Sequence, residues 1–106
     1  MNKKASIPFE VHNMNFLQDP EQVALYLEES YSEGGDELFQ IALRNVAKAQ
    51  QGGLKGVATN AGLNRENLYR ALSKSGNPQS KTIKKILNAL GIEVQMHFVV
   101  KNAGNI

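Results

Sequence analysis

The chain has 106 residues, of which 42% are hydrophobic and 21% are charged, a composition typical of one small globular domain. It contains no Cys, which excludes a disulfide framework and a thiolate metal site, and its two His lie far apart, at His12 and His97. No apolar run approaches the roughly 18 residues of a membrane span, and no apolar signal segment follows the N-terminus. We therefore expect a cytoplasmic protein that holds no metal and contacts no membrane.

The net charge of +2 is distributed unevenly along the chain. Residues 1–40 contain two basic and eight acidic residues, a net charge of −6, whereas residues 41–106 contain ten basic and two acidic residues, a net charge of +8. A basic half of this kind attracts polyanions, and an acidic half attracts basic partners. Residue types alone are also compatible with simple attraction between the two halves inside one fold.

The first 18 residues show no helical period and are predicted to form an extended N-terminal arm. Residues 7–12 alternate weakly between apolar and polar side chains, but Pro8 lacks a backbone N–H and restricts such a segment to an edge strand. The arm precedes a predicted domain of residues 19–91, which is followed by a strand and tail in residues 92–106.

Two helices are predicted at the start of the domain, separated by Gly34-Gly35. Asp19 is a good N-cap for the first helix, and Pro20 occupies the first helical position, where its missing N–H costs nothing. Apolar residues then recur at helical spacing until the glycines end the helix. Asp36 is a good N-cap for the second helix, whose apolar stripe continues to about residue 50.

Three more helices are predicted in the basic half. They span residues 54–60, 65–73 and 80–90. Asn64 is a good N-cap for the second of these helices and Ser80 for the third, which Gly91 ends. The caps and glycines therefore divide this half into short helices joined by short turns.

The segment that follows, residues 92–98, alternates apolar and polar side chains with a period of two before Val99 and Val100. This alternation indicates a β-strand and is the strongest strand signal in the chain. The predicted fold is therefore all-α, with about five helices that include a helix-turn-helix, plus a short C-terminal β-strand.

Residues 54–72 have the features of a helix-turn-helix. Ala58 is the small residue needed where two helices touch, Gly62 tolerates the positive φ of a tight turn, and Leu63 is an apolar plug after it. The inner face of the hairpin is apolar and contains Val57, Leu68 and Leu72. An ordinary helical hairpin with a solvated polar face is the alternative, but a position within a half of charge +8 favours DNA binding.

The outer face of the second hairpin helix is polar. It contains Arg65, Glu66, Asn67, Tyr69, Arg70 and Lys74. Arginine pairs bidentately with guanine and asparagine with adenine, so Arg65 and Asn67, near the helix N-terminus, are the best placed for base contacts. Tyr69 and Lys74 are suited to phosphate contacts.

Residues 62–73, which read GLNRENLYRALS and are followed by Gly76-Asn77-Pro78, resemble the probable addiction-module antidote proteins. These are HigA-like antitoxins with a lambda-repressor/Cro-type helix-turn-helix. The resemblance extends upstream to residues 19–27 and 35–39 and downstream to residues 90–92, and it covers roughly residues 8–96.

The resemblance implies a lambda-repressor-like antitoxin that neutralises a RelE/HigB-like, ribosome-dependent mRNA interferase and represses its own operon. The family's recognition-helix role, carried over to the matching positions, assigns base contacts in double-stranded operator DNA to Arg65, Glu66, Asn67, Tyr69 and Arg70. Phosphate contacts are predicted for Lys55, Asn64, Lys74, Lys81 and Lys84.

The start of the first hairpin helix departs from the family pattern. Relatives usually have a Ser/Thr-Gln pair here, whose side chains cap the helix and touch phosphate, whereas this chain has Lys55-Gly56. The cap is lost, and a glycine inside a helix costs up to about 1 kcal/mol relative to alanine. Lys55 is expected to replace the phosphate contact by its charge alone.

The acidic half is predicted to meet a toxin, because a toxin that holds mRNA presents a basic surface. The predicted toxin contacts are Glu21, Tyr26, Glu28, Glu29, Tyr31 and Glu33. The alternative is that the tyrosines pack inside the domain and the acidic side chains only solvate its surface.

We expect a homodimer on a palindromic operator, because one recognition helix alone buries too little surface to be selective. The strand at 92–100 is predicted to pair with its copy in the partner or, alternatively, with residues 7–11 of the same chain. No catalytic residue, cofactor or small-molecule substrate is predicted, so the chain is not expected to be an enzyme. The alternatives are a stand-alone phage-type repressor without a toxin and a protein-interaction domain that has lost DNA binding.

Overall fold

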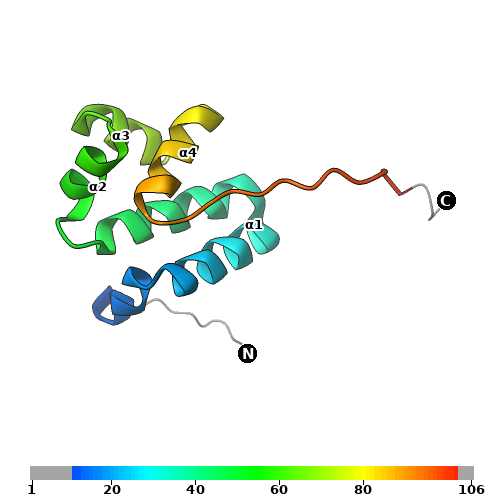
Figure 1. The fold of residues 1–106 in the computed structure, drawn as a ribbon, viewed down its shortest axis with the longest axis horizontal. Helices are drawn as coiled ribbons and strands as arrows, with labels where there is room; N and C mark the ends of the chain where they lie inside the picture. Colours follow the sequence, from blue (N-terminus) through cyan, green and yellow to red (C-terminus); the bar gives the residue numbers. More distant parts are fainter. Residues whose placement is uncertain (1–10, 103–106) are drawn as a thin grey trace.

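The computed structural model describes residues 11–102, which contain one 3-10 helix and four α-helices (Figure 1). The elements are η1 (Val11–Gln18), α1 (Pro20–Ala49), α2 (Gly53–Ala61), α3 (Arg65–Leu72) and α4 (Ser80–Ala89). The predicted all-α class is confirmed. The predicted count of five helices and the predicted C-terminal strand are both wrong for the described residues.

Helix α1 combines the two helices predicted at the start of the domain. It begins as predicted, with Pro20 at its first position and the Asp19 side chain accepting a hydrogen bond from the Glu21 backbone N–H at 3.1 Å. Gly35, at φ 64° and ψ −148°, bends the element into two arms without an intervening loop (Figure 1). Such a positive φ suits glycine, so Gly35 turns the chain where a second N-cap had been predicted.

Side chains on both arms pack across this bend. The rings of Tyr31 and Phe39 meet edge to face, with centroids 6.2 Å apart. A Cβ atom at Gly34 would collide with the Leu38 side chain, so the backbone and the second arm are in close contact here. The bend is therefore a packed feature of the core-forming helix rather than an open hinge.

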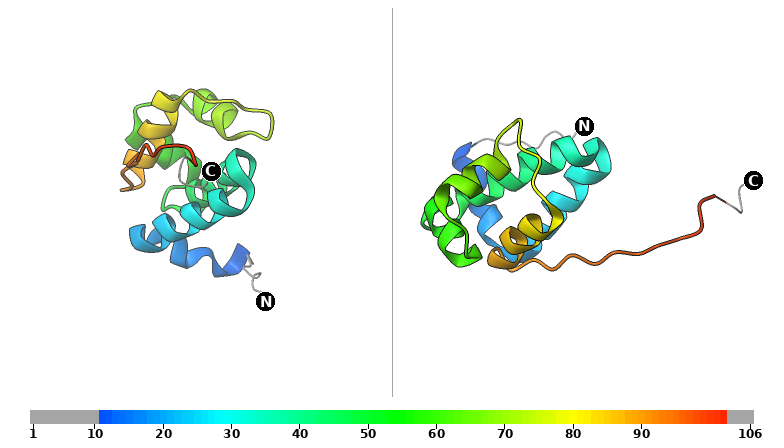
Figure 2. Two further views of the ribbon diagram at one scale, coloured as in Figure 1. Left: turned by 90° about the vertical axis from the view of Figure 1, so that its right-hand side faces the viewer. Right: turned by 90° about the horizontal axis from the view of Figure 1, so that it is seen from above.

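The second arm of α1 runs through the middle of the domain, with α2, α3 and α4 on one side of it and η1 and the first arm on the other (Figures 1 and 2). The hydrophobic core fills the space between this arm and the surrounding elements. Its largest fully buried side chains are Leu17, Val23, Leu43, Val46, Leu68, Leu72 and Ile86. Helix α1 packs against η1, α2 and α3, and α2 packs against α3 and α4. None of the helices among the described residues is both long and apolar enough to span a bilayer.

The segment Val11–Gln18 is a 3-10 helix, so the predicted extended arm is wrong for these residues, while residues 1–10 lie outside the described part. Leu17 is 1% exposed and belongs to the core. The Gln50 side chain donates to the Leu17 carbonyl at 2.7 Å, and the Gln18 side chain donates to the Ala49 carbonyl at 2.8 Å. These long-range contacts hold η1 against the end of α1, which no local periodicity reveals.

Helix α4 spans nearly the predicted range, but its N-cap differs. Gln79 occupies the cap position without a side-chain hydrogen bond, and Ser80 is the first helical residue, so the predicted Ser80 cap is wrong. The helix ends at Ala89, and Gly91 follows with φ 81°, as expected for a glycine after a helix.

The tail, defined here as residues 92–102, is extended but is not part of a β-sheet. At its start, the Ile92 N–H donates a hydrogen bond to the Leu87 carbonyl of α4 at 2.9 Å. Beyond this residue the tail projects away from the helices (Figures 1 and 2). Phe98 is 90% exposed and Val99 84% exposed. The alternation correctly indicated extended backbone, but a strand also needs a pairing partner, and the described part of the chain supplies none.

Candidate nucleic-acid interface

The hairpin of α2 and α3 is closed by a tight turn at Gly62. This glycine has φ 72°, its N–H donates to the Thr59 carbonyl at 3.2 Å, and the Leu63 N–H donates to the Ala58 carbonyl at 2.9 Å. This pair of hydrogen bonds is the Schellman arrangement, which satisfies carbonyl groups at the end of a helix. The structure thus confirms the predicted turn and the reason for its glycine.

The two helices meet through the predicted apolar face. Ala58 is 2% exposed, and Val57, Leu68 and Leu72 are each 3% exposed or less. Leu63 is partly buried and packs against the core. A small residue at Ala58 lets α2 and α3 approach closely, so the exposed side of α3 is held on a well-packed support.

Asn64 caps α3, as predicted. Its side-chain oxygen accepts a hydrogen bond from the Asn67 backbone N–H at 2.7 Å, and Glu66 lies in the first turn. The cap uses only this oxygen, so the side-chain N–H groups of Asn64, which are its donors, remain available to a phosphate.

The predicted base-contacting residues all lie exposed on α3. This set, called the α3 face, consists of Arg65, Glu66, Asn67, Tyr69 and Arg70. Tyr69 is 47% exposed, and the Arg70 guanidinium donates to the Asn67 side-chain oxygen at 3.3 Å. The face therefore presents hydrogen-bonding groups, with Arg70 and Asn67 already oriented toward each other.

Two side chains of α1 that the sequence did not single out hold the end of α3. The Gln40 amide donates to the carbonyls of Ala71 at 3.0 Å, Ser73 at 2.6 Å and Gly76 at 3.2 Å. The Arg44 guanidinium donates to the Leu72 carbonyl at 3.1 Å. Gln40 and Arg44 lie four residues apart, next to the apolar stripe of the second arm. This spacing is the only sequence signal that the two side chains hold the end of α3.

The start of α2 explains the unusual Lys55-Gly56 pair in part. The helix begins at Gly53, one residue earlier than predicted, with Gly52 at the cap position (φ 87°) and no side-chain cap. A Cβ atom at Gly56 would lie 3.1 Å from the Gln51 carbonyl oxygen, closer than ordinary packing. The missing side-chain cap is confirmed, and Gly56 accommodates the tight entry into the helix.

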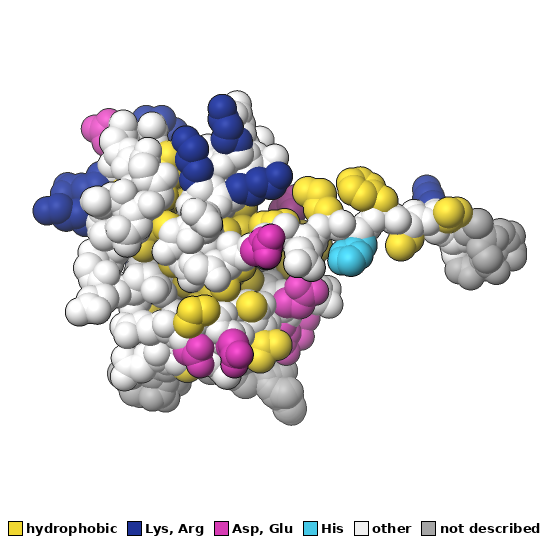
Figure 3. Space-filling view, viewed as in Figure 1, with side chains coloured by type: hydrophobic (Ala, Val, Ile, Leu, Met, Phe, Trp, Pro, Cys, Tyr) yellow, Lys and Arg dark blue, Asp and Glu magenta, His cyan; other side chains and the backbone are white. Residues whose placement is uncertain are grey.

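The two kinds of charge are separated on the surface. Figure 3 shows Lys and Arg side chains gathered over the α2–α4 end of the visible face, and most Asp and Glu side chains toward the opposite end. The lysines predicted to contact phosphate are all exposed: Lys55, Lys74, Lys81 and Lys84. The basic half of the sequence therefore forms a basic region around the hairpin.

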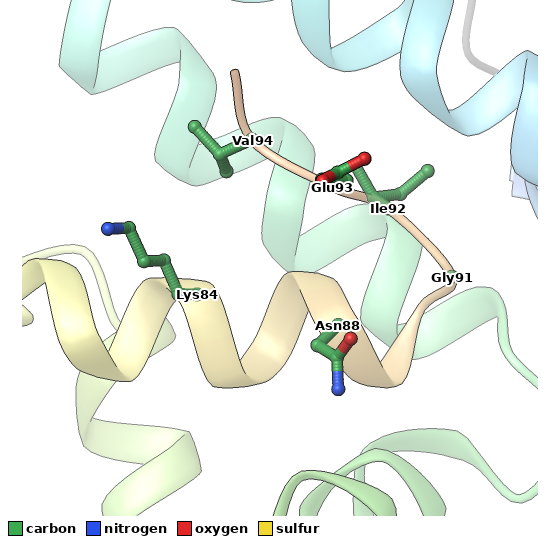
Figure 4. A pocket seen from close by; sticks show the side chains of 6 residues that line it. All are labelled: Lys84, Asn88, Gly91, Ile92, Glu93 and Val94. Atoms are coloured by element: carbon green, nitrogen blue, oxygen red, sulfur yellow. The ribbon is translucent and has the colours of Figure 1, made fainter. Parts of the chain in front are cut away.

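Lys84 also borders an open depression between α4 and the tail (Figure 4). Its lining consists of Lys84, Asn88, Gly91, Ile92, Glu93 and Val94. In Figure 4 the first residues of the tail, Ile92 to Val94, run alongside α4, so the two sides of the depression come from consecutive parts of the chain. Lys84, which is predicted to contact phosphate, therefore lies on α4 beside the start of the tail and not on the α2–α3 hairpin.

The predicted toxin contacts lie on the first arm of α1, where the acidic face, defined as Glu21, Glu28, Glu29 and Glu33, is exposed. Tyr31 is 57% exposed. Tyr26 is only partly exposed: its ring meets Phe16 edge to face, and its hydroxyl accepts a hydrogen bond from the Asn45 amide at 3.1 Å. The structure therefore separates the two tyrosines and ties Tyr26 to the interior.

Leu25 is the residue that sequence reasoning missed on this arm. Its side chain is 63% exposed and lies one helical turn from Glu21 and from Glu28 and Glu29. An exposed leucine among acidic residues was detectable in the sequence because it falls outside the apolar stripe of the helix.

Together these features define a small all-helical domain with a basic region around one hairpin and an acidic face on another helix. Residues 7–98 match the family of probable addiction module antidote proteins, and the chain therefore belongs to this family. An uncharacterized protein of Haemophilus influenzae is 39% identical over 80 residues, which cover 76% of this chain and 80% of that protein. No solved structure gives a significant match. Membership in the family gives the chain an antitoxin role, with a cognate toxin as its partner.

Proposed function

We propose that this antitoxin neutralises a RelE/HigB-like mRNA interferase and represses its own operon by binding operator DNA. The observation that carries the DNA-binding part is the α3 face, which is exposed on a hairpin held by apolar packing, an N-cap and the Gln40 contacts. Neither activity requires a cofactor, a small-molecule substrate or a catalytic residue, so the proposed function is not enzymatic.

On DNA, α3 would enter the major groove with its N-terminal end toward the base edges, in the manner of a helix-turn-helix recognition helix. Arg65 is suited to guanine and Asn67 to adenine. The Arg70–Asn67 hydrogen bond of 3.3 Å would orient the asparagine amide or exchange for a base contact. Glu66 and Tyr69 complete the surface that follows the groove.

Phosphate contacts from Lys55, Lys74, Lys81 and Lys84 would supply affinity without sequence information. Replacing all four by Ala is expected to reduce the slope of log affinity against log salt concentration by roughly one per lost contact. Lys48→Ala, which removes an exposed lysine of α1 outside this set, is the matched control. An unchanged slope in the quadruple variant contradicts the phosphate assignment.

A homodimer is part of the proposal, because α3 spans only eight residues and reads a short half-site. Two copies related by a two-fold axis would place two such helices on a palindrome. A gel shift with the DNA upstream of the gene tests operator binding, and a failure to retard this DNA at low salt contradicts it.

For the toxin, the acidic face of α1 would approach a basic, RNA-binding surface, with Leu25 and Tyr31 as apolar contacts. Tyr26 is left out of the contact set because it is partly buried against the core and contacts Phe16 and Asn45. A stand-alone repressor of the phage type has no use for an acidic face, which would repel DNA, so this face favours the antitoxin. Co-purification with the product of an adjacent toxin gene tests this part.

A further inference from the structure

The tail has two chemically distinct sides. Its even-numbered positions are all apolar: Ile92, Val94, Met96, Phe98 and Val100. Its odd-numbered positions are polar except for Val99: Glu93, Gln95, His97, Val99 and Lys101. Because successive side chains of extended backbone point to opposite sides, the tail presents one apolar side and one largely polar side.

The apolar side of the tail beyond Ile92 and the backbone of residues 93–101 lack cover within the described residues. Met96 is 63% exposed, Phe98 90% and Val100 79%. Among residues 11–102, no backbone hydrogen bond involves residues 93–101, whereas Ile92 still bonds to α4 and packs against the core. The apolar side therefore begins at the core and continues outward without a partner, which is the arrangement of a strand ready for pairing.

We propose that the tail pairs antiparallel with the tail of a second copy of this chain, centred on His97 opposite the partner's His97. In this register Glu93 lies opposite the partner's Lys101, and the two-fold axis repeats this Glu–Lys pair at the other end. On the apolar side Val94 meets the partner's Val100, and Met96 meets the partner's Phe98. Opposite charges and apolar pairs directly across two strands stabilise a sheet.

Other registers lose these matches. Moving the centre by half a residue places each even-numbered apolar position opposite an odd-numbered one, and all of these except Val99 are polar. A half-buried ribbon does not tolerate this mismatch. Moving it to Met96 places Glu93 opposite the partner's Val99, and moving it to Phe98 places Lys101 opposite the partner's Gln95. Charge complementarity therefore selects the register centred on His97, and a second copy of this sequence supplies it.

This interface gives the proposed homodimer a location, but it does not depend on DNA binding. Because dimerisation is measured without DNA, a failure of this inference and a failure of operator recognition are distinguishable. Strand pairing with a toxin instead of a second copy is the rival outcome, and it predicts a chain that is monomeric when alone.

Single cysteine variants of the full chain test the register directly, since the natural chain has no Cys. Residues opposite each other in an antiparallel pair have the Cα separation that a disulfide needs. His97→Cys is expected to form a disulfide-linked dimer under mild oxidation. Gln95→Cys and Val99→Cys are expected to link poorly alone but efficiently when the two proteins are mixed.

Equal linking of all three single variants would indicate random collisions of exposed tails and would overturn the proposal. A monomeric natural chain in light scattering at micromolar concentration would overturn it as well. If that monomer's tail amides became protected from exchange only when toxin was added, the toxin would be the true partner of the strand.

Charge reversal tests the Glu–Lys pairs independently of any crosslink. Glu93→Lys and Lys101→Glu are each expected to weaken the dimer, by roughly two- to thirtyfold in dissociation constant, because each places like charges opposite each other at both ends of the ribbon. The double variant is expected to restore the natural constant to within a few-fold. A double variant no tighter than either single variant would contradict the proposed register.

Discussion

Replacing Gln40 tests how strongly α1 holds the end of the candidate recognition helix. The Gln40 amide donates to the carbonyls of Ala71, Ser73 and Gly76 at 2.6–3.2 Å, so Gln40→Leu keeps most of the side-chain volume but removes every donor. A hydrogen bond contributes about 0.5–1.5 kcal/mol net, and one amide has two N–H groups. The expected loss in free energy of unfolding is therefore about 1–3 kcal/mol.

Urea unfolding followed by circular dichroism measures this loss, and hydrogen exchange locates it. Amides at the end of α3 and in the loop to Gly76 should exchange faster in Gln40→Leu, with little change in η1. Gln51→Leu, which alters an exposed glutamine of the turn before α2, is the matched control. A loss below about 0.5 kcal/mol, or exchange that rises equally everywhere, would refute the anchoring role of Gln40.

Gln40→Glu adds a dependence on pH with a defined sign. The new carboxyl would face the three carbonyl oxygens, which disfavours its charged form and raises its pKa in the folded state above the unfolded value. The variant should therefore be least destabilised at low pH, where the carboxyl is protonated in both states, and should lose stability as the pH rises through the folded-state pKa. Destabilisation that does not change with pH would contradict this geometry.

The other predictions concern the hairpin and the acidic face. Asn64→Ala removes the cap of α3 and should cost about 1 kcal/mol in calorimetry, with Asn60→Ala, an exposed asparagine of α2, as the control. Gly62→Ala should cost about 1–2 kcal/mol because its φ is 72°, although there is room for the methyl group; an unchanged melting temperature would contradict this. Replacing Glu28, Glu29 and Glu33 together by Gln should slow toxin association at low salt, and an unchanged rate would contradict the electrostatic role.

Features set by neighbouring residues were predictable from the sequence. Asp19 and Asn64 cap their helices as predicted, and Gly62 closes the hairpin with the expected positive φ. In each case the residue and the backbone groups that it serves lie within a few residues of one another, so composition and spacing contain the whole interaction.

Features that depend on distant parts of the chain were not predictable. Gly34-Gly35 is compatible with a loop or with a bend, and packing between the two arms of α1 decides for the bend. The contacts of Gln40 span more than 30 residues of sequence, so no local pattern contains them. The tail is the clearest example, because alternating apolar and polar residues predict an extended backbone but do not identify the strand with which it pairs.

In the candidate site, too, the locally determined features were predictable and those that depend on distant residues were not. The positions of the α3 face, from Arg65 to Arg70, follow from helical periodicity once the Asn64 cap sets the start of the helix. The toxin surface was less accessible, because a tyrosine in a helix suits either a core or an interface. Tyr26 contacts Asn45, whereas Tyr31 remains largely exposed, and only the fold distinguishes them.

The most direct test of the central claim, that the α3 face reads operator DNA, is a binding comparison across single base-pair variants of the upstream operator. The natural chain should lose about 1–3 kcal/mol of binding free energy when the base pair that faces Arg65 is changed. Arg65→Ala should bind the natural operator more weakly by a similar amount and should no longer distinguish the bases at that one position. If Arg65→Ala retained the affinity and base preferences of the natural chain at every position, the claim would be contradicted.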